Sequence, residues 1–484
     1  MKKNLTIMLA AVLMSCAGAR EESVFGIISN AETCPIPDTV SVLRNPCCGW
    51  GLYDDADGEV SDARQYWEKQ DGAAKYASFF YLRWRWSDME PEEGKYAWLY
   101  DENYKALIQG ALDRGLHLAF RIYIHGMDNL RPGTPDFVRQ AGAKGCKAGG
   151  HWTPYIDDPV FQEKLAAFIK AFAKEYDNPA IVDFVDGVNA GWWGECHHLN
   201  LGNPDNKEAV LHWFTDTYGK AFQKVPLIMP VCSEFGFDTE MRIAVGRNGY
   251  AFRRDGLGSR WFNPAEKANV RKLFPGTLLI GESCYWKGDL TDVPHFQDDL
   301  YNFKTWRQVL EATYNDAVNF HFNTLDLRQP LEAERWLTKA PDLVEAFIRN
   351  GGYRIAPKVI SAPKRLRNGS KAVIAHRWEN TATGFFPNSN RRWNYKYRVA
   401  FALLDADGNP CKVYVDNQSD PSEFIKGNVV DYIFNIEAVD IAPGTYTWAT
   451  SIVDTSGENL PSIRLAAEGG QQGQWLRLNQ VRVR

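Results

Sequence analysis

The sequence lacks any surplus of positive charge. Its 484 residues carry 55 Lys and Arg against 60 Asp and Glu, a formal net charge of −5 at pH 7. Because both signs are interspersed, there is no basic face of the kind that binds phosphate backbones, and no nucleic-acid partner is expected. Metal motifs are also lacking, since the nine cysteines are scattered and none has the spacing of zinc ligands. We therefore expect neither a metal nor a cofactor.

The apolar run near the N-terminus, residues 7–14, is too short to span a bilayer. Two lysines precede it and a Ser-Cys pair follows, which is typical of a signal peptide rather than of a transmembrane anchor. The tetrad Leu-Met-Ser-Cys at 13–16 resembles a bacterial lipobox. By that resemblance residues 1–22 are a signal peptide and tether, and Cys16 carries lipid. The protein is then expected to be exported and anchored in the bacterial cell envelope, at the outer membrane, facing the periplasm or the cell surface.

An exported chain meets an oxidising compartment, so disulfides are allowed. Cys146 and Cys196 fall on loops that follow neighbouring predicted strands, and we predict a disulfide between them. The vicinal pair Cys47 and Cys48 is expected to stay reduced against the core.

The length of the chain predicts about two domains, because a single core stops growing below this size. After a polar linker, short apolar runs alternate with helical patterns, which indicates repeated strand–helix units. Eight runs are expected as strands: 47–52, 78–86, 117–125, 181–188, 226–231, 250–254, 277–282 and 317–323. Such an order is typical of a (β/α)8 TIM barrel, an α/β fold, and we place it at 40–353.

The helices between these runs are indicated by residues that can cap a helix at its N-terminus. Asp101 and Asp158 are expected to cap helices that carry apolar residues at helical spacing. In the predicted strands the two faces alternate, so Arg83, Arg85 and Arg121 are expected to point into the barrel and to meet carboxylates near its mouth. In 317–323 the same alternation puts Val318, Phe320 and Phe322 outside and Asn319, His321 and Asn323 inside.

Carboxylates follow several of the predicted strands. In a barrel of this kind the working residues lie at the C-terminal ends of the strands. Cleavage of a glycosidic bond needs two carboxyl groups, one to protonate the departing oxygen and one to attack the anomeric carbon or to activate water. The acids in question are Glu90, Asp186, Glu195, Glu234, Asp238, Asp255, Glu282 and Asp326.

One segment carries a family resemblance. WRWSDMEPEEGKYAWLYDENYKALIQGALDRGLHLAFRI is similar to the second strand, loop, helix and third strand of retaining clan A glycoside hydrolases, especially the β-galactosidase-like ones. The matching residues are Trp86, Glu90, Pro91, Gly94 and Tyr96, and the likeness spans about 44–323. In that clan the acid/base Glu ends strand four and the nucleophilic Glu ends strand seven. The resemblance implies Glu195 as acid/base and Glu282 as nucleophile of an O-glycosyl hydrolase.

The sequence departs from that clan at one position. An Asn usually stands directly before the acid/base, whereas this chain has Gly194. Asn189 is the nearest substitute for holding the substrate. Asp186 is the reserve candidate for the acid, and Glu90 is expected to be structural, ion-paired beneath the site.

Aromatic and histidine side chains after strand ends form the expected sugar platform. With 17 Trp and 21 Tyr, the chain has many flat rings with a polar edge, which suit sugars, although most of them are expected in the core. Together with the inward arginines, the expected substrate contacts are Trp50, Arg83, Arg121, Tyr123, His125, Asn189, Trp192, Trp193, His197, Tyr285, Trp286 and His321.

From about residue 354 the pattern changes to strands separated by turns. The strand-like runs are 371–376, 397–404, 430–435, 446–453 and 475–483. Their spacing predicts a β-sandwich at 354–484, which either binds glycan or braces the barrel.

The sequence therefore predicts a glycoside hydrolase that cleaves an oligosaccharide or polysaccharide with two carboxylates and with retention of configuration. Two alternatives stay open. One is a surface lipoprotein that binds glycan without cleaving it, and the other is a polysaccharide lyase that uses Arg83, Arg121, Tyr123 and His125. Sugar, linkage and oligomeric state have no signal in the sequence.

Overall fold

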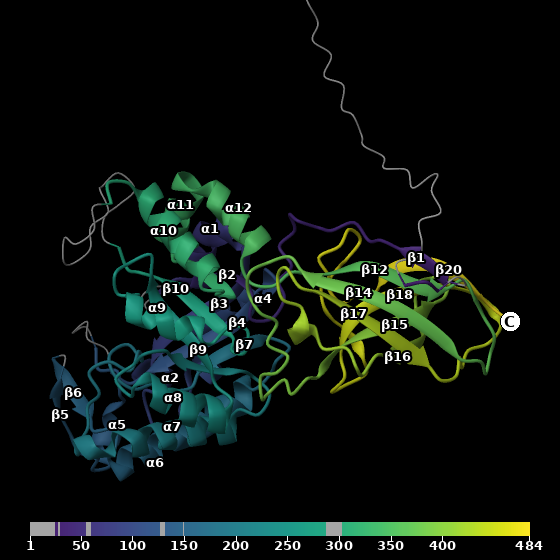
Figure 1. Cartoon of the computed structure of the whole chain (residues 1–484). Coiled ribbons are helices and arrows are strands. Elements are labelled where there is room, and N and C mark those ends of the chain that lie inside the picture. Colours follow the sequence, from purple (N-terminus) through teal and green to yellow (C-terminus); the bar gives the residue numbers. More distant parts are fainter. Residues whose placement is uncertain (1–24, 28–29, 55–59, 126–130, 149, 287–302) are drawn as a thin grey trace, which may run out of the picture.

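The computed structural model describes residues 25–27, 30–54, 60–125, 131–148, 150–286 and 303–484. Its first part is a closed barrel of parallel strands surrounded by helices, and its second part is a β-sandwich (Figure 1). The barrel strands follow one another in chain order around the ring: β2 (Gly49–Tyr53), β3 (Ala77–Arg85), β4 (His117–Tyr123), β7 (Val182–Asp186), β8 (Leu227–Pro230), β9 (Ala251–Leu257), β10 (Leu279–Ser283) and β11 (Thr324–Arg328). The predicted TIM barrel is confirmed.

Alternation along the strands separates two cores. In β3, Phe80, Leu82 and Trp84 point outward and pack with the surrounding helices, whereas Phe79 and Tyr81 point into the barrel. This period of two is the pattern expected for strands with different neighbours on their two faces. Polar residues that follow these apolar ones on the inner face therefore lie nearer to the C-terminal end of the barrel.

The helices start where the sequence predicts. Asp101 accepts a hydrogen bond from the Tyr104 backbone, and Asp158 accepts hydrogen bonds from the backbones of Val160 and Phe161. The helices and helical turns are α1 (Ala63–Ala74), α2 (Trp86–Met89), α3 (Ala97–Tyr100), α4 (Glu102–Asp113), α5 (Asp136–Gln140), α6 (Pro159–Tyr176), η1 (Pro204–Asn206), α7 (Lys207–Ala221), α8 (Phe237–Glu240), η2 (Met241–Arg247), α9 (Pro264–Arg271), α10 (Trp306–Asn319), α11 (Pro330–Lys339), α12 (Pro341–Asn350) and η3 (Pro421–Glu423). A short hairpin, β5 (Gly145–Ala148) and β6 (His151–Pro154), lies in one of the loops.

The eighth strand was predicted at 317–323, and this is wrong. Helix α10 continues to Asn319, and the strand begins only at Thr324. The apparent alternation arises because the end of a helix is followed by a tight turn, in which His321 has a φ of 62°. In the true strand Leu325 and Leu327 pack outward, and Asp326 and Arg328 point inward.

The C-terminal part consists of two packed sheets. One sheet contains β1 (Asn30–Thr33), β12 (Ile355–Pro363), β14 (Ala372–Asn380) and β17 (Val429–Ile436). The other contains β13 (Arg365–Leu366), β20 (Leu476–Val483), β18 (Gly444–Asp454), β15 (Tyr397–Leu404) and β16 (Pro410–Val415), with β19 (Leu460–Ile463) beside β18. Strand β1 precedes the barrel in the chain, yet it pairs with β12. The N-terminal segment is thus tied to the sandwich.

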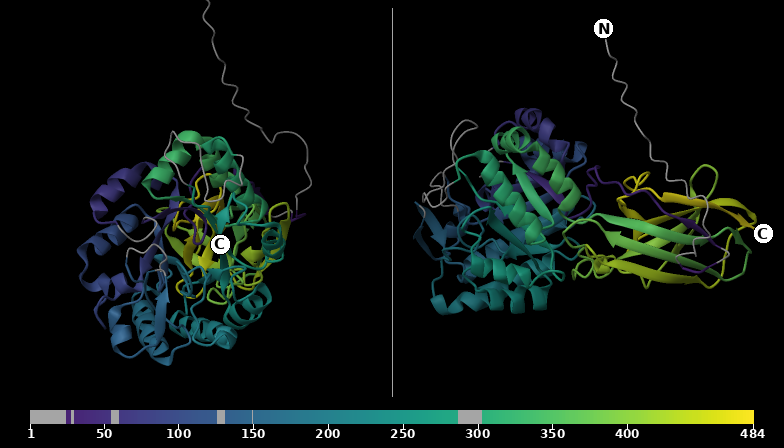
Figure 2. Two further views of the ribbon diagram at one scale, coloured as in Figure 1. Left: turned by 90° about the vertical axis from the view of Figure 1, so that its left-hand side faces the viewer. Right: turned by 45° about the horizontal axis from the view of Figure 1, so that its top comes forward.

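The sandwich closes the N-terminal end of the barrel (Figure 2). Phe79, Phe184 and Leu278 of the barrel interior belong to the same buried cluster as Tyr353 and Trp378 of the sandwich. The buried Asn323, just before β11, joins the two parts, because its amide nitrogen donates to the Phe385 carbonyl at 2.7 Å and its oxygen accepts from the Phe385 N–H at 2.9 Å. The open end of the barrel therefore faces away from the sandwich.

The predicted disulfide between Cys146 and Cys196 is wrong, because both are free thiols. Cys146 donates to Asn200, while Cys196 is buried beneath the loop after β7. Cys47 and Cys48 are reduced and buried against the core, as predicted. Within the part of the chain that the structure describes, none of the helices combines the length and the apolar character needed to cross a membrane. Cys16 lies outside the described residues.

Candidate active site

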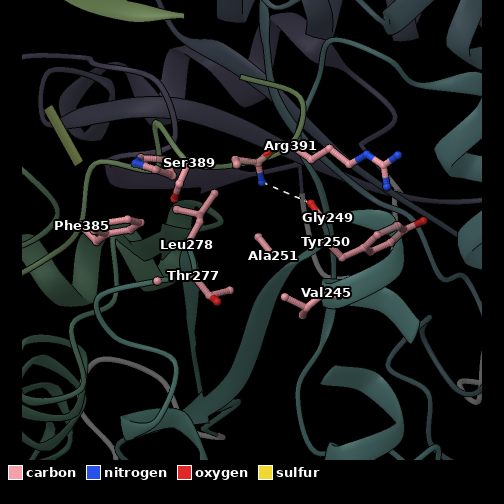
Figure 3. Close-up of a pocket in the computed structure, with 13 residues that line it drawn as sticks. Val245, Gly249, Tyr250, Ala251, Thr277, Leu278, Phe385, Ser389 and Arg391 are labelled. Carbon is pink, nitrogen blue, oxygen red and sulfur yellow. Dashed lines mark hydrogen bonds between the residues drawn. The ribbon is translucent and has the colours of Figure 1, made fainter. Parts of the chain in front are cut away.

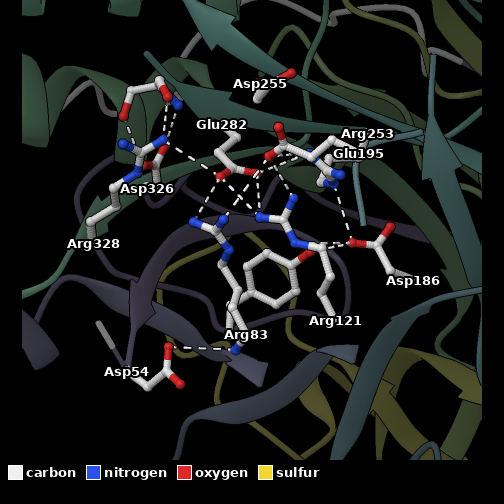
Figure 4. Close-up of polar contacts among 12 residues, drawn as sticks. Asp54, Arg83, Arg121, Asp186, Glu195, Arg253, Asp255, Glu282, Asp326 and Arg328 are labelled. Carbon is white, nitrogen blue, oxygen red and sulfur yellow. Dashed lines mark hydrogen bonds and ion pairs between the residues drawn. The ribbon is translucent and has the colours of Figure 1, made fainter. Parts of the chain in front are cut away.

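The polar side chains at the C-terminal end of the barrel form one buried ion-pair network (Figure 4). Its carboxylates are Asp186, Glu195, Glu282 and Asp326, and its guanidinium groups are Arg83, Arg121, Arg253 and Arg328. The network draws on strands β3, β4, β7, β9, β10 and β11, together with the loop after β7. A site at this end is where barrel enzymes place their working residues.

Glu282, near the end of β10, is the centre of this network. Its side chain is 1% exposed. Arg121 lies 3.2 Å from both of its oxygens, and Arg253 Nη1 lies 3.1 Å from Oε2. Arg83 and Arg328 each approach Oε1 to 3.6 Å. Four guanidinium groups thus surround one carboxylate. Their positive charges could not be buried beside a neutral carboxyl group, so Glu282 is expected to be ionised.

Glu195 lies beside Glu282 and shares its arginines. Arg121 Nη1 donates to Glu195 Oε1 at 2.8 Å, while Nη2 of the same guanidinium faces Glu282. Arg253 Nη1 lies 3.9 Å from Glu195 Oε1 and 3.1 Å from Glu282 Oε2, so these two oxygens are at most about 7 Å apart. The structure thus brings together the two carboxylates that the sequence singled out, and also the two predicted arginines Arg83 and Arg121.

The arginines set the protonation of both carboxylates. Burial alone would raise the pKa of Glu282, but Arg121, Arg253, Arg83 and Arg328 lower it to about 2. For Glu195, burial again acts upward, while the hydrogen bond with His197 and the charges of Arg121 and Arg253 bring its pKa well below the usual range. Both carboxylates are therefore ionised at neutral pH in the free protein.

Asp186, the reserve candidate for the acid, lies deeper in the barrel. Its Oδ2 accepts hydrogen bonds from the Tyr81 hydroxyl and from Arg253 Nε, the latter at 3.2 Å. Burial raises its pKa against the opposing effect of Arg253 and Arg121. Since it is 1% exposed and held by these groups, Asp186 has the environment of a structural partner of the arginines.

The loop that carries Glu195 is held in a strained conformation. Trp193, Cys196 and His198 have φ values of 51°, 58° and 50°, in the left-handed region that non-glycine residues rarely adopt. Each such residue costs about 1–3 kcal/mol, and such residues cluster at functional sites. Hydrogen bonds hold the loop: the Trp192 N–H donates to the His197 carbonyl at 2.9 Å, and the Trp193 N–H donates to the His125 carbonyl at 2.8 Å.

The conformation of this loop favours glycine at position 194. Its φ is +72°, and a Cβ there would lie 3.2 Å from Cβ of Tyr123 and 3.5 Å from the Arg121 side chain. An Asn at this position would be strained and would press on the arginine that holds both carboxylates. The departure from the clan pattern thus has a steric reason in this structure.

Several predicted contact residues surround the two carboxylates. Trp192 stacks on the His198 ring, with centroids 3.4 Å apart, and Trp193 is half-buried beside it. The Tyr285 residue is 40% exposed, and Arg328 lies 4.1 Å from its ring centroid. His125 is 4% exposed, neither of its ring nitrogens has a hydrogen-bond partner among the residues that the structure describes, and burial lowers its pKa to about 4. Tyr123 is fully buried beneath Gly194.

Four predicted contact residues lie elsewhere. Trp50 is fully buried on the outer face of β2, where its ring packs on Trp336 and its Nε1–H donates to the Val344 carbonyl. The amide of Asn189 donates to the Ile122 carbonyl and pairs with Tyr218 of α7, so it faces the helix layer.

Trp286 is buried in a satellite cluster with Trp306 and Val309 rather than presented as a platform. His321 lies at the N-terminal end of β11, where Nδ1 is 2.7 Å from the Thr383 carbonyl oxygen and the ring stacks on Phe274. The structure thus gives these four side chains other surroundings than the predicted sugar platform, because position in the chain does not show which face of an element a side chain occupies.

Other site residues were not singled out from the sequence. Arg253 lies in β9, which was predicted as a strand without an assignment of its faces, and Arg328 lies in the strand that was misplaced. The alternation of Thr324, Asp326 and Arg328 with leucines is the signal that would have found the latter.

Glu90 has a structural environment, as expected, but its partners are hydrogen-bond donors rather than the expected ion-pair partner. It accepts from Trp86 Nε1–H at 2.8 Å and from the Gly94 N–H at 2.8 Å. Among the described residues, no group of three or more His, Cys, Asp and Glu side chains is arranged to hold a metal ion.

A cavity of about 210 Å3 lies between barrel and sandwich (Figure 3). Tyr250 and Leu278 line it from the starts of β9 and β10, and Phe385 and Ser389 line it from the sandwich side. It is therefore at the opposite end of the barrel from the carboxylates. None of the predicted site residues is among the described residues that line it.

Comparisons with known proteins give only distant structural similarity. No protein-family model matches the sequence, and no curated protein matches it. Endo-glycoceramidase II from Rhodococcus sp. is 13% identical with a TM-score of 0.42, over 83% of this chain and 100% of that chain. An exo-β-1,4-mannosidase from Opitutaceae bacterium strain TAV5 is 13% identical with a TM-score of 0.36, over 64% of this chain and 58% of that one. The catalytic domain of β-amylase from Paenibacillus polymyxa is 10% identical with a TM-score of 0.41, over 62% of this chain and 99% of that one.

Replacement of Arg121 by Met is expected to lower the free energy of unfolding by about 3–5 kcal/mol, because two buried carboxylates lose a shared partner. Urea unfolding measures the change. The control is Arg64→Met, which removes an exposed i,i+4 pair with Glu68 and should cost about 0.5 kcal/mol or less. A loss below 1 kcal/mol for Arg121→Met would mean that the network is not held by this residue.

Acid should weaken the fold through Glu282. Its pKa is about 2 in the folded protein and about 4.3 when unfolded, so its stabilising effect is complete above pH 4.3 and is lost as the pH falls toward 2. For this buried group the effect is on the order of 3 kcal/mol. Urea unfolding at several pH values from 6 to 3 should show a steeper loss for the wild type than for Glu282→Gln. Equal slopes would contradict the assigned environment.

Proposed function

We propose that the protein is a retaining O-glycosyl hydrolase in which Glu282 attacks the anomeric carbon and Glu195 is the acid and base. The observation that carries this proposal is the pair of buried carboxylates at the barrel mouth, whose facing oxygens are at most about 7 Å apart. Retaining enzymes hold their two carboxyl groups about 5–5.5 Å apart, and inverting enzymes about 6.5–9.5 Å. A distance of at most about 7 Å between these oxygens is compatible with the retaining separation and lies below most of the inverting range.

The environment of Glu282 suits a nucleophile. A nucleophilic carboxylate must be ionised, and the four surrounding guanidinium groups keep it so. When its oxygen bonds to the anomeric carbon, the negative charge on the carboxylate disappears. Arg83, Arg121, Arg253 and Arg328 then remain to stabilise Glu282 as it leaves in the second half of the reaction.

The substrate is proposed to be an oligosaccharide or polysaccharide. Tyr285, Trp192 and Trp193 offer partly exposed rings around the carboxylates, and such rings stack on the apolar faces of sugars. The neutral imidazole of His125 has two ring nitrogens without a hydrogen-bond partner in the described part of the chain, and these can bind hydroxyl groups. The described arginines of the network already face carboxylates of the protein, which leaves little positive charge for the acidic sugar that a lyase needs.

A second candidate function is glycan binding without cleavage. It is favoured by the ionised state of Glu195, since an acid catalyst has to carry a proton. We further propose that the protein is exported and anchored in the bacterial envelope through lipid on Cys16, which the lipobox-like tetrad supports. Metabolic labelling with a fatty-acid analogue, compared between wild type and Cys16→Ser, tests the anchor.

The test of hydrolysis is a screen of 4-nitrophenyl glycosides and natural glycans with the wild type, Glu282→Gln and Glu195→Gln. Loss of the nucleophile should lower kcat by at least about 1,000-fold, and loss of the acid by about 100-fold or more. Glu68→Gln on the exposed face of α1 is the control and should be unaffected. Circular dichroism checks that each variant is folded.

The same screen separates the two candidate functions. A wild type that binds a glycan but releases no product from any substrate would select glycan binding. Undiminished hydrolysis by a folded Glu282→Gln variant would refute the assigned pair.

A further inference from the structure

The surroundings of Glu195 do not favour the proton that an acid catalyst must carry. The proposed hydrolysis must protonate the departing oxygen, yet Glu195 Oε1 lies 2.8 Å from Arg121, 3.9 Å from Arg253 and 4.0 Å from Arg83. Three guanidinium groups around one oxygen stabilise the ionised carboxylate. A proton for the reaction therefore has to be held by a neighbouring group.

His197 is placed to hold it. Its Nε2 lies 3.2 Å from Glu195 Oε2, the oxygen that Arg121 leaves unoccupied, and its side chain is 44% exposed at the barrel mouth. The strained loop fixes this position, because the His197 carbonyl accepts from the Trp192 N–H and passes so close to Gly191 that a Cβ there would lie 2.2 Å from it. The imidazole thus connects the buried carboxylate with solvent.

The charges that face His197 favour its protonated form. Burial acts to lower its pKa, whereas the hydrogen bond and charge of Glu195 and the charge of Asp255 raise it, and Arg254 opposes them. The balance raises the pKa of His197 above its ordinary value.

We infer that His197 holds the transferable proton of the site and supplies it to the departing oxygen through Glu195, an inference that rests on the proposed hydrolysis. His197 then acts on the reaction through Glu195 and does not itself contact the substrate. Glu195 is the group that touches the substrate.

The steps balance over one turnover. His197 Nε2–H gives its proton to Glu195 Oε2, and Glu195 protonates the glycosidic oxygen as its bond to the anomeric carbon breaks. The Glu282 carboxylate forms its bond to that carbon, so the leaving group departs as a neutral alcohol and His197 is left neutral. In the second half water attacks the same carbon, the bond to Glu282 breaks, and the proton of the water returns through Glu195 to His197.

The first test needs no substrate. The His197 ring is titrated by NMR in the wild type and in Glu195→Gln, and its signal is assigned by its absence from His197→Gln. The wild-type pKa should lie above 6.5 and should fall in Glu195→Gln, because the charge that stabilises the imidazolium has been removed. A wild-type pKa at or below 6.5, or one unchanged in Glu195→Gln, would overturn the inference.

The second test is kinetic and uses the phenyl and 2,4-dinitrophenyl glycosides of a sugar that the wild type cleaves. In His197→Gln, kcat/KM at pH 7 should fall about 100-fold on the phenyl glycoside, whose leaving group needs a proton. It should change less than about 5-fold on the dinitrophenyl glycoside, which departs without one. The wild-type pH profile should lose activity as His197 deprotonates, above its raised pKa.

His212→Gln is the matched control, since His212 lies on the surface of α7 beside Glu208 and should be unaffected on both substrates. Equal losses on both glycosides in His197→Gln would show that His197 only maintains the loop, and would overturn the inference. If the wild type cleaves no glycoside, the proposed function fails, while the titration still decides where the proton is held.

Discussion

The site depends on one buried guanidinium group. Arg121 lies in the middle of the inner face of β4 with its side chain fully buried, and it contacts Glu195 with one terminal nitrogen and Glu282 with the other. Its Nε also lies 3.7 Å from Asp186. One side chain thus fixes the relation between β4, β7, β10 and the loop after β7. Because a charged group in the barrel is tolerated only when it is paired, each of these contacts constrains the others.

The rest of the fold protects this arrangement. The loop after β7 takes up left-handed backbone conformations in order to carry Glu195 over Arg121, and Gly194 leaves room for that arginine. At the other end the sandwich seals the barrel, where apolar side chains such as Phe79 and Phe184 join the core of the sandwich. Water has access from the mouth, beside His197. The polar network is therefore confined between an apolar floor and one opening, and this confinement strengthens its electrostatic interactions.

The barrel was predictable because its signal is local and repeated. Seven of the eight predicted strands overlap the observed barrel strands, whereas the eighth failed because a helix end and a turn imitated the alternation of a strand. Arg83 followed from the alternation of faces along its strand, and Glu195 and Glu282 followed from their places at or after strand ends. Arg253 was missed because its partner carboxylates are distant in the sequence, and local periodicity carries no information about such pairings.

The orientation of single aromatic rings was the least predictable feature. Trp50 occurs in a strand, as expected, but near its beginning and on the face that meets the helices. The protonation state of Glu195 was equally unpredictable, since its pKa depends on burial, on a histidine two residues away and on Arg121 and Arg253 from two other strands. These properties arise only when the barrel closes.

The most direct test of the central claim is the configuration of the first product. Hydrolysis of an aryl glycoside by the wild-type protein is followed by proton NMR, and the anomeric signal is read before mutarotation. The proposed attack by Glu282, with Glu195 as acid and base, predicts that the product first appears with the configuration of the substrate. A product of inverted configuration, or no hydrolysis of any glycoside, would contradict the account.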